Sequence, residues 1–234
     1  MMKGLIEFND YSLIVENIDV LSNINLSFEE GKVILIYGPR GSGKSTLLRS
    51  LVRLNEEIYY SIVEKGEIFF NGKNLRDFDV KFLRKQITYV DTSFLEAMDE
   101  LSFKGFVELG FRGNDFSLED FSKELDDFEI LRNLDKGLNT PLKCFYPADK
   151  IMLLLFFLSV KSPQVILIDS ILDHLDDENL ERVSRKLKTL SCKSTMIIST
   201  RFHQRFLPIA DLLVVIRDGK IEYEGVPEFF VLEG

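Results

Sequence analysis

The stretch KVILIYGPRGSGKSTLLRSLVRL, residues 32–54, decides the fold. It begins with KVILIYG, a continuous apolar run that is typical of a strand buried on both faces of a parallel sheet. The segment GPRGSGKS fits the pattern G-x-x-x-x-G-K-[ST], and STLLRSLVRL has the composition of a helix. A strand, a glycine-rich loop and a helix in this order predict a phosphate-binding loop.

The residues of this loop predict a nucleotide site. Glycines allow backbone N–H groups to close around phosphate oxygens. Lys44 is expected to reach the β- and γ-phosphates, and Ser45 to ligate Mg²⁺. The alternative, an incidental glycine turn before a helix, leaves the lysine and serine unexplained. The predicted nucleotide-binding residues are Gly38, Pro39, Arg40, Gly41, Ser42, Gly43, Lys44, Ser45 and Thr46.

A second apolar strand, VILID at residues 165–169, ends in a carboxylate. A lone aspartate at a strand end is usually a turn or cap residue. Beside an intact phosphate loop, Asp169 is instead predicted to hold Mg²⁺, directly or through water. The next residue is Ser170, and a serine hydroxyl cannot take a proton from water near neutral pH without a base of its own. The strand therefore supplies a metal ligand without an adjacent catalytic base.

Hydrophobic patterning places this loop in an α/β protein with a mostly parallel core sheet. Short strands and an Asn71-Gly72 turn predict an N-terminal antiparallel β subdomain. The pattern from about residue 91 to 148 is helical, which predicts an inserted helical subdomain. We expect a single domain over 1–234, in which 1–90 and 149–234 form the core and the β subdomain.

Three helices are predicted from their apolar residues. In the insert, Ser117 and Asp120 lie near the start of a 3-4-3 pattern formed by Leu118, Phe121, Leu125 and Phe128. A later helix carries Leu180, Val183, Leu187 and Leu190. The run IMLLLFFLSV, residues 151–160, is too short to span a bilayer and is expected to be a buried core helix.

The composition restricts the classes of function. The net charge of −9 argues against a nucleic-acid binder that depends on a basic face. The two cysteines, Cys144 and Cys192, lack CxxC spacing, so a disulfide framework or paired metal ligation is not expected. The N-terminus lacks the apolar stretch of a signal peptide. We expect a cytoplasmic protein that is able to dock on a membrane protein.

These motifs, in this order, resemble the ATP-binding subunits of ABC transporters, and the resemblance covers essentially the whole chain. It includes the Leu175-Asp176 pair of a D-loop. GPRGSGKSTLLRSLVRLNE followed by EKGEIFFNGKNL is most similar to the phosphate-importer ATPases. The resemblance implies ATP and Mg²⁺ as ligands and a head-to-tail homodimer or a heterodimer with another ABC ATPase. It also implies a membrane-spanning transporter subunit as partner, with the chain peripheral on the cytoplasmic face of the membrane.

The chain departs from the family pattern at its catalytic positions. The family's LSGGQ signature corresponds to CFYPA, residues 144–148, in which Pro147 cannot donate a backbone N–H. The catalytic glutamate that follows the magnesium-binding aspartate corresponds to Ser170. The switch histidine corresponds to Arg201, whose pKa forbids proton shuttling. His203, two residues on, is interpreted as a surface histidine.

Two further family positions are also changed. The Q-loop glutamine corresponds to Asp91, which becomes a candidate metal ligand. The aromatic residue that stacks on adenine corresponds to Val15, with Tyr11 as a nearby substitute. No catalytic residue is assigned from the resemblance.

Three interpretations follow. The first is an ABC-type subunit that binds Mg-ATP with weak or absent hydrolysis, because loss of a general base alone costs about 10²–10⁴ in rate. Such a subunit would be regulatory, structural or a divergent transporter component. The second is a working importer ATPase, for phosphate or another solute, that uses substitute residues. The third is an interaction module of ABC fold whose phosphate loop is vestigial.

Overall fold

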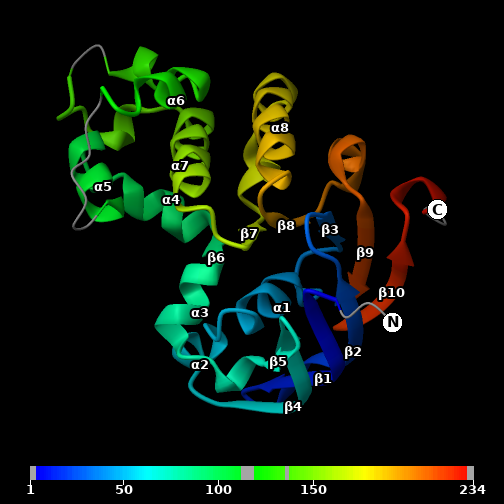
Figure 1. The fold of residues 1–234 in the computed structure, drawn as a ribbon. Helices are drawn as coiled ribbons and strands as arrows, with labels where there is room; N and C mark the ends of the chain where they lie inside the picture. The colour runs from blue at the N-terminus through cyan, green and yellow to red at the C-terminus, as the bar shows by residue number, and fades with distance from the viewer. Residues whose placement is uncertain (1–3, 112–118, 135–136, 231–234) are drawn as a thin grey trace. The chain divides into compact units, whose positions relative to one another are not determined.

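The computed structural model describes residues 4–111, 119–134 and 137–230 of the 234-residue chain. Figure 1 shows its helices and strands. The chain divides into two compact units. The first consists of Met1–Val90, Pro163–Asp173 and Ser191–Gly234, and the second of Asp91–Ser162 and His174–Leu190. The phosphate loop lies in the first unit.

A six-stranded sheet in the order β10-β9-β3-β8-β7-β6 forms the first unit's core. The strands are β3 (Val33–Tyr37), β6 (Ile87–Val90), β7 (Val165–Asp169), β8 (Thr195–Thr200), β9 (Leu212–Arg217) and β10 (Lys220–Gly225). Neighbouring strands are parallel except β9 and β10. β3 and β7 lie on either side of β8 and run parallel to it. The phosphate loop and Asp169 therefore both lie at the carboxyl ends of the strands. The mixed, mostly parallel sheet confirms the expected α/β class.

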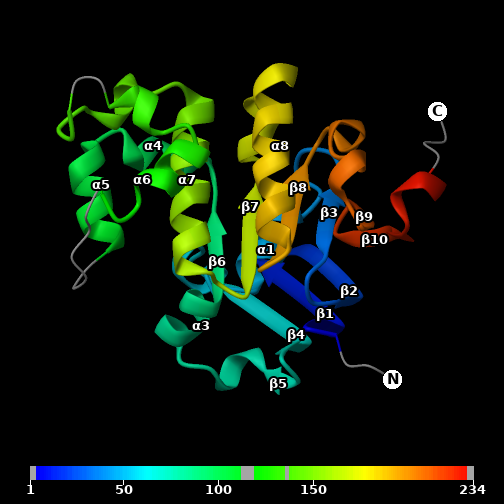
Figure 2. The ribbon, with the colours of Figure 1, turned by 45° about the horizontal axis from the view of Figure 1, so that its top comes forward.

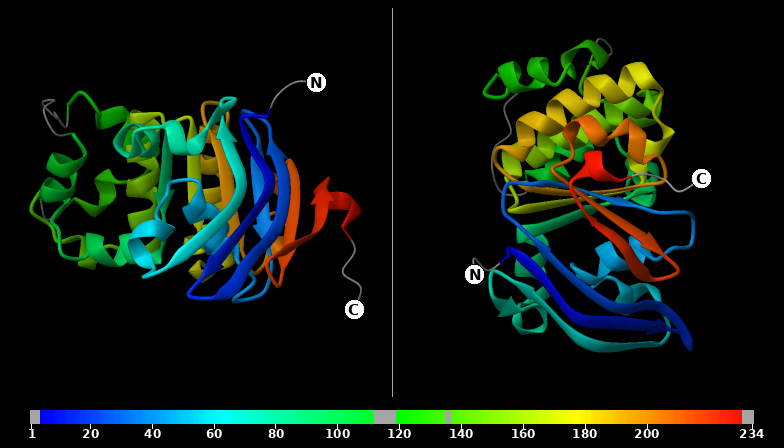
Figure 3. Two further views of the ribbon diagram at one scale, coloured as in Figure 1. Left: turned by 90° about the horizontal axis from the view of Figure 1, so that it is seen from below. Right: turned by 90° about the vertical axis from the view of Figure 1, so that its right-hand side faces the viewer.

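The N-terminal strands form a separate antiparallel sheet in the order β2-β1-β4-β5. They are β1 (Ile6–Val15), β2 (Ile18–Phe28), β4 (Ile62–Phe70) and β5 (Lys73–Asn74). The turn between β4 and β5 has positive φ at Asn71 and Gly72, 53° and 73°, as a type I′ hairpin requires. Figures 2 and 3 show the two sheets of this unit as separate layers. Their buried side chains, with those of α1 (Lys44–Ser50), form one hydrophobic core.

Short helices connect the strands of the first unit. They are α2 (Asn55–Ile58), η1 (Leu75–Asp77), α3 (Val80–Gln86), η5 (His203–Arg205), η6 (Leu207–Ile209) and η7 (Pro227–Phe229). A further turn of 3-10 helix, η4 (Ile171–His174), begins just after Asp169 and Ser170. Its residues up to Asp173 belong to the first unit, and His174 belongs to the second.

The second unit is helical around one apolar helix. Its elements are α4 (Thr92–Met98), α5 (Phe103–Gly110), α6 (Ser122–Asp127), η2 (Leu131–Asn133), η3 (Leu142–Cys144), α7 (Pro147–Lys161) and most of α8 (Asp177–Ser191). Residues 151–158 of α7 are all buried, which confirms the expected core helix. Phe106 of α5 packs edge to face on Phe157 of α7, with 4.6 Å between the ring centroids.

The helices agree with the sequence patterns in most of their extent. The four apolar residues predicted for the later helix are buried in α8. In the insert, Leu125 and Phe128 are buried but α6 is only six residues long, and Ser117 and Leu118 lie outside the described residues. The predicted division assigns α7 and α8 to the core part of the chain, whereas their contacts group them with the helical unit. Within the described residues, no helix is long and apolar enough to cross a membrane.

Candidate nucleotide-binding site

The loop between β3 and α1 has a backbone that only glycine permits at its two ends. A Cβ on Gly38 would lie 2.1 Å from the carbonyl oxygen of Ile216. Gly43, the N-cap of α1, has φ of 103°, and a Cβ there would lie 2.9 Å from the Leu21 side chain. The glycine pattern of the sequence is therefore a packing and backbone requirement of this tight loop.

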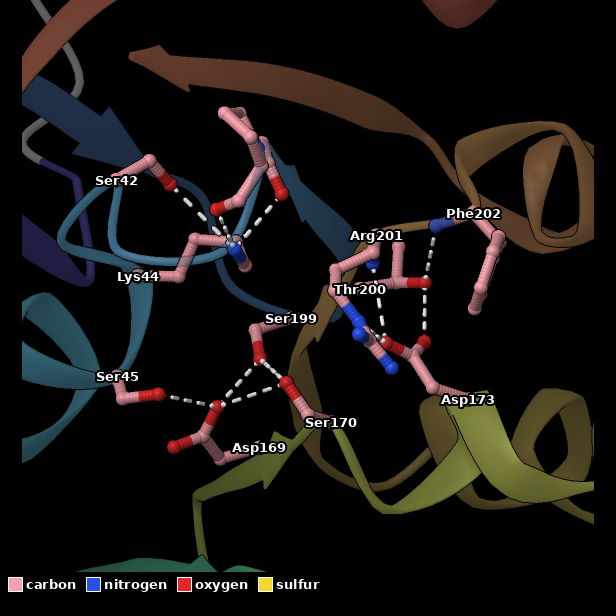
Figure 4. Close-up of polar contacts among 12 residues, drawn as sticks. Ser42, Lys44, Ser45, Asp169, Ser170, Asp173, Ser199, Thr200, Arg201 and Phe202 are labelled. Atoms are coloured by element: carbon pink, nitrogen blue, oxygen red, sulfur yellow. Dashed lines mark hydrogen bonds and ion pairs between the residues drawn. The ribbon is translucent and has the colours of Figure 1, made fainter. Parts of the chain in front are cut away.

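The Lys44 ammonium lies inside the loop. Its Nζ donates to the carbonyl oxygens of Gly38 and Pro39, both at 2.7 Å, and to Ser42 Oγ at 3.4 Å (Figure 4). The residue is 6% exposed. Burial lowers the pKa of Lys44, and the charges of Asp169 and Asp173 oppose this shift. These three acceptors are neutral oxygens, which an anionic phosphate is able to displace.

Asp169 ends β7 in a cluster of hydroxyl groups. Its Oδ1 accepts from Ser45 Oγ at 3.0 Å and from Ser199 Oγ at 2.5 Å, and its Oδ2 accepts from the Tyr89 hydroxyl at 2.7 Å. The residue is 3% exposed. Burial and the negative charge of Asp169 raise the pKa of Tyr89. The donors in these three contacts are neutral hydroxyl groups. They leave the negative charge of the carboxylate available to a cation.

The distance between Ser45 and Asp169 fits a magnesium ion. Mg²⁺ binds oxygen ligands octahedrally at about 2.0–2.1 Å, so neighbouring ligands lie about 2.9 Å apart. Ser45 Oγ and Asp169 Oδ1 are separated by 3.0 Å. In the described part of the chain, no group of three or more His, Cys, Asp and Glu side chains is placed to hold a metal ion. Two oxygens at this spacing would leave the other positions of an octahedral site to further oxygen ligands.

Asp91 is used locally in a different way. It is the N-cap of α4, and its Oδ1 accepts the backbone N–H of Phe94 at 3.0 Å. It belongs to the second unit, whereas Ser45 and Asp169 belong to the first. This carboxylate caps a helix, and a metal role for Asp91 stays a prediction.

Ser170 turns its hydroxyl into the same cluster. Its Oγ lies 3.1 Å from Ser199 Oγ and 3.4 Å from Asp169 Oδ1. Its φ is 58°, a left-handed conformation that costs a non-glycine residue about 1–2 kcal/mol. Such conformations persist where surrounding contacts hold them, and they are common at functional sites. Ser170 N–H donates to the Ser199 carbonyl at 3.2 Å, which is one of those contacts.

Arg201 and Asp173 form an ion pair next to this cluster. Arg201 Nε lies 3.3 Å from Asp173 Oδ2, and the Arg201 backbone N–H donates to the same oxygen at 3.1 Å. Thr200 Oγ1 donates to the other carboxylate oxygen at 2.5 Å. The Asp173 side chain is fully buried, and that of Arg201 is 41% exposed. No pattern in the sequence predicted this pair.

Neither residue expected to stack on adenine has an accessible face. Tyr11 is 2% exposed, and its hydroxyl contacts Glu64 Oε1 at 2.6 Å and Ser50 Oγ at 2.9 Å. Burial and Glu64 raise the pKa of Tyr11. Val15 is 6% exposed and pairs with strand neighbours on both sides. A base cannot stack on a side chain enclosed in the core, so the assignment of Tyr11 and Val15 is wrong.

A different tyrosine lies beside the phosphate loop. A pocket of about 220 Å³ is lined by the loop from Gly41 to Thr46 and by Val20, Arg49 and Tyr59. Tyr59 follows α2 and is half-buried. In the sequence, Tyr59 is visible only as one of two consecutive tyrosines. Its position beside the phosphate loop follows from the fold.

His203 is buried, so its interpretation as a surface histidine is wrong. It is 7% exposed, and its ring lies 4.4 Å from that of Tyr37 and 5.6 Å from that of Phe230, between centroids. Loss of hydration lowers the pKa of His203. Tyr37 ends β3 directly before the phosphate loop, so the aromatic group supports the base of that loop.

In the second unit, CFYPA leads into α7. Tyr146 is the N-cap residue, without a side-chain cap hydrogen bond, and Pro147 is the first helical residue. In the first turn Asp149, with a side chain 4% exposed, accepts from Arg132 and Arg182, both at 2.8 Å. Arg182 also pairs with Glu129 at 2.9 Å. The start of α7 is therefore occupied by side chains of the unit itself.

The fold and the loop define a nucleotide-binding α/β protein, and comparison with known proteins identifies the family. A family model described as ABC transporter matches residues 21–192. The chain belongs to this family, whose ATPases bind ATP with Mg²⁺ and associate with the membrane subunits of transporter complexes. The N-terminal antiparallel sheet, the mostly parallel core and the helical region are those expected from the resemblance.

Similar proteins include several importers. The chain is 26% identical to the Fe(3+) ions import ATP-binding protein FbpC of Fusobacterium nucleatum, over 89% of the chain and 54% of that protein. It is 28% identical to the sulfate/thiosulfate import ATP-binding protein CysA of Mesostigma viride, over 91% of the chain and 59% of that protein. The chain thus spans somewhat more than half the length of these two relatives.

A third relative and a solved structure match over most of their length. The chain is 27% identical to the phosphate import ATP-binding protein PstB 2 of Lactobacillus johnsonii, over 98% of the chain and 94% of that protein. The structure of cbiO1 from Clostridium perfringens, part of the ABC transporter complex cbiONQ, superposes with a TM-score of 0.77 at 20% identity. The alignment covers 97% of this chain and 90% of cbiO1, and it shows a shared fold.

Proposed function

We propose that this chain holds Mg-ATP as a component of an ABC transporter and hydrolyses it slowly or not at all. The binding part rests on one observation. The Lys44 ammonium lies among displaceable carbonyl oxygens of the loop, and Ser45 and Asp169 present two oxygens at the spacing of magnesium ligands. Ser45 and Asp169 would hold Mg²⁺, which when bound neutralises phosphate charge.

The slow turnover rests on the groups that follow β7 and β8. Ser170 offers a hydroxyl that is bonded to Ser199 and Asp169, and a hydroxyl is a poor proton acceptor near neutral pH. Arg201 offers N–H donors and no acceptor atom, so it does not replace the missing base. Loss of a positioned base costs about 10²–10⁴ in rate, whereas the contacts of Lys44 and Ser45 with phosphate do not depend on it.

The start of α7 supports the same proposal. A phosphate oxygen at a helix start is held by backbone N–H donors. Pro147 lacks that donor, and the two arginines at the start of α7 already bind the Asp149 carboxylate. By family resemblance this segment would face the nucleotide of a partner chain. A dimer containing this chain would therefore be impaired at the site on its own phosphate loop and at the site that it completes.

We further propose that the nucleotide base lies against Tyr59. The pocket beside the loop extends from the residues that would hold phosphates to this ring, and aromatic rings stack on bases without strong sequence requirements. Tyr59 takes the role first assigned to Tyr11 and Val15.

The partners and location follow from family membership and are part of the proposal. We infer that the chain pairs with a second copy or with another ABC ATPase. We also infer that it attaches to a membrane-spanning transporter subunit on the cytoplasmic face of the membrane. With impaired sites in both roles, it fits a regulatory or structural subunit better than half of an ordinary motor.

Calorimetric titration with Mg-ATP tests the binding part. We expect Lys44→Ala to weaken ATP binding by at least about tenfold, because hydrogen bonds to charged groups contribute about 1.5–3 kcal/mol each. Lys193→Ala, at an exposed position, is the matched control and should bind as the wild type does. If the wild type bound no nucleotide at millimolar concentration, the proposal would be wrong and an interaction module with a vestigial loop would be favoured.

A working phosphate-importer ATPase is the second candidate function. It is favoured by the match to a phosphate import protein over nearly the full length of both chains. Iron and sulfate importers match at similar identity, so phosphate rests mainly on this coverage and on the sequence that follows the loop. Lys44-dependent phosphate release at a rate typical of transporters, together with phosphate uptake that requires this chain, would establish it.

A further inference from the structure

A closed ring of contacts joins α1 to the carboxylate that ends β7. Ser45 and Arg49 are four residues apart on α1, so their side chains lie on the same face of the helix. Ser45 Oγ donates to Asp169 Oδ1 at 3.0 Å, and Arg49 Nε donates to the Tyr89 hydroxyl at 3.1 Å. The Tyr89 hydroxyl in turn donates to Asp169 Oδ2 at 2.7 Å. Both oxygens of the carboxylate are thereby tied to the same helix.

The sheet places Tyr89 beside this carboxylate. Tyr89 lies on β6, which runs parallel to β7, and it pairs there with Leu167. Leu167 and Asp169 are two residues apart on β7, so their side chains share one face of the sheet. The side chain of Tyr89 lies on that face as well, because paired residues of neighbouring strands point the same way. All the residues of the ring belong to the first unit.

The direction of each hydrogen bond in the ring follows from the groups that form it. An arginine side chain has donors and no acceptor, and an ionised carboxylate has acceptors only. The oxygen of the Tyr89 hydroxyl therefore accepts from Arg49, and its one hydrogen is donated to Asp169. A charged donor polarises the hydroxyl that accepts from it, which strengthens the bond that the hydroxyl donates. Arg49 thus supports the bond from Tyr89 to the carboxylate.

The ring fixes which oxygen of Asp169 faces the phosphate loop. Oδ1 accepts from Ser45 and Ser199, and Ser170 Oγ lies 3.4 Å from the same atom (Figure 4). The torsion that turns an aspartate carboxylate is soft, because it joins a tetrahedral carbon to a planar one. The bond from Tyr89 to the other oxygen limits this rotation. The oxygen that lies at the spacing of a magnesium ligand from Ser45 is therefore kept in place.

We propose that Tyr89 is a positioning residue for Mg²⁺, held by Arg49 and acting through Asp169. It keeps the carboxylate, before the ion binds, in the orientation that the ion needs. This inference rests on the proposed Mg-ATP binding. Hydrogen-bond partners of metal ligands orient those ligands, and loss of one typically lowers metal affinity about 10–100-fold.

Two other roles are distinguishable from this one. If Tyr89 and Arg49 only attach α1 to β6, their loss would weaken ATP binding equally with and without Mg²⁺. If the Tyr89 hydroxyl competes with the ion for Asp169, its loss would strengthen the binding that depends on Mg²⁺. The three roles therefore differ in one quantity, the ratio of the affinity for ATP in excess Mg²⁺ to the affinity for ATP in EDTA.

The test is a calorimetric measurement of this ratio for wild type, Tyr89→Phe, Asp169→Asn and the double variant. We expect Tyr89→Phe to lower the ratio about tenfold and to change the affinity for ATP in EDTA by less than about twofold. Asp169→Asn should itself lower the ratio, and adding Tyr89→Phe should not lower it further. Tyr11→Phe is the matched control, because it also removes a hydroxyl that contacts a carboxylate, Glu64 Oε1 at 2.6 Å. Its ratio should equal that of the wild type.

Arg49→Lys tests the other bond of the ring and remains usable if Tyr89→Phe fails to fold. Lysine keeps the positive charge but lacks the planar donor geometry of arginine, so we expect the ratio to fall about twofold to fivefold. A ratio that stays at the wild-type value in both variants would overturn the inference. So would equal losses with and without Mg²⁺, or a ratio that rises in Tyr89→Phe.

The wild-type measurements separate this inference from the proposed function. Absence of ATP binding, or binding that Mg²⁺ does not strengthen, contradicts that function and the role of Tyr89 together. Binding that Mg²⁺ strengthens in the wild type, with the same ratio in Tyr89→Phe, contradicts only the role of Tyr89.

Discussion

The phosphate loop and the segment before α7 both lead into the N-terminus of a helix, but their residues differ in what they offer an anion. In the loop, Lys44 is held by neutral carbonyl oxygens that a phosphate is able to displace. At the start of α7, Pro147 removes a donor and Asp149 brings a carboxylate that two arginines already neutralise. The difference supports the proposal that the chain keeps the groups that would bind its own nucleotide and lacks those that would contact a partner's nucleotide.

The largest expected effect concerns the ion network at α7. Asp149→Asn leaves the mostly buried Arg182 with one carboxylate fewer, and breaking a buried pair costs about 3–5 kcal/mol. Because Arg132 is half-exposed, we expect the free energy of unfolding to fall by about 2–3 kcal/mol. Urea denaturation measures it, and Asp127→Asn, at an exposed position, is the control. An unchanged midpoint would mean that the network does not hold the start of α7.

A smaller effect is expected from the loss of the Tyr59 ring beside the phosphate loop. Tyr59→Ala should weaken Mg-ATP binding by about fivefold to tenfold, the equivalent of about 1 kcal/mol of stacking, and leave tripolyphosphate binding unchanged. The chain has no tryptophan, so Tyr59→Trp gives a unique fluorescent probe. Its emission should respond to ATP and not to tripolyphosphate. Equal responses to both ligands would place the base elsewhere.

The sequence predicts features whose residues lie close together along the chain better than features whose residues lie far apart. The loop, Asp169 and the core helix are recognisable because their signals lie within a few consecutive residues. The Asp173–Arg201 pair joins residues that are 28 positions apart and depends on the order of β7 and β8 in the sheet. Tyr11 was misassigned because an aromatic residue in an alternating strand points to the core or to solvent according to register, which sequence alone does not fix.

A smaller effect should appear as pH dependence of stability. The pKa of His203 is lowered by burial, so below about 6.5 the unfolded chain binds a proton that the folded chain does not. The contribution of neutral His203 to stability is complete above that pH and is lost as pH falls through the folded-state pKa. Wild type should therefore lose more stability between pH 7.5 and 5 than His203→Phe. Identical losses in urea denaturation would contradict the buried, neutral state.

The smallest expected effect tests whether the two regions act together. Ser170→Glu supplies a carboxylate beside Asp169 but leaves Pro147 and Asp149 unchanged. We expect phosphate release to stay close to the wild-type rate, because the donors at the start of α7 are still missing. A Lys44-dependent gain of about 100-fold or more would show that the start of α7 does not limit turnover.

If this chain binds ATP and hydrolyses it slowly or not at all, as we propose, ATP should stay intact while it is bound. Purified protein is incubated with Mg-ATP, separated from free ligand, and the bound nucleotide is quantified over an hour beside Lys44→Ala. We expect intact ATP on the wild type throughout and little nucleotide on the variant. Conversion of the bound ATP to ADP within seconds, abolished by Lys44→Ala, would contradict it.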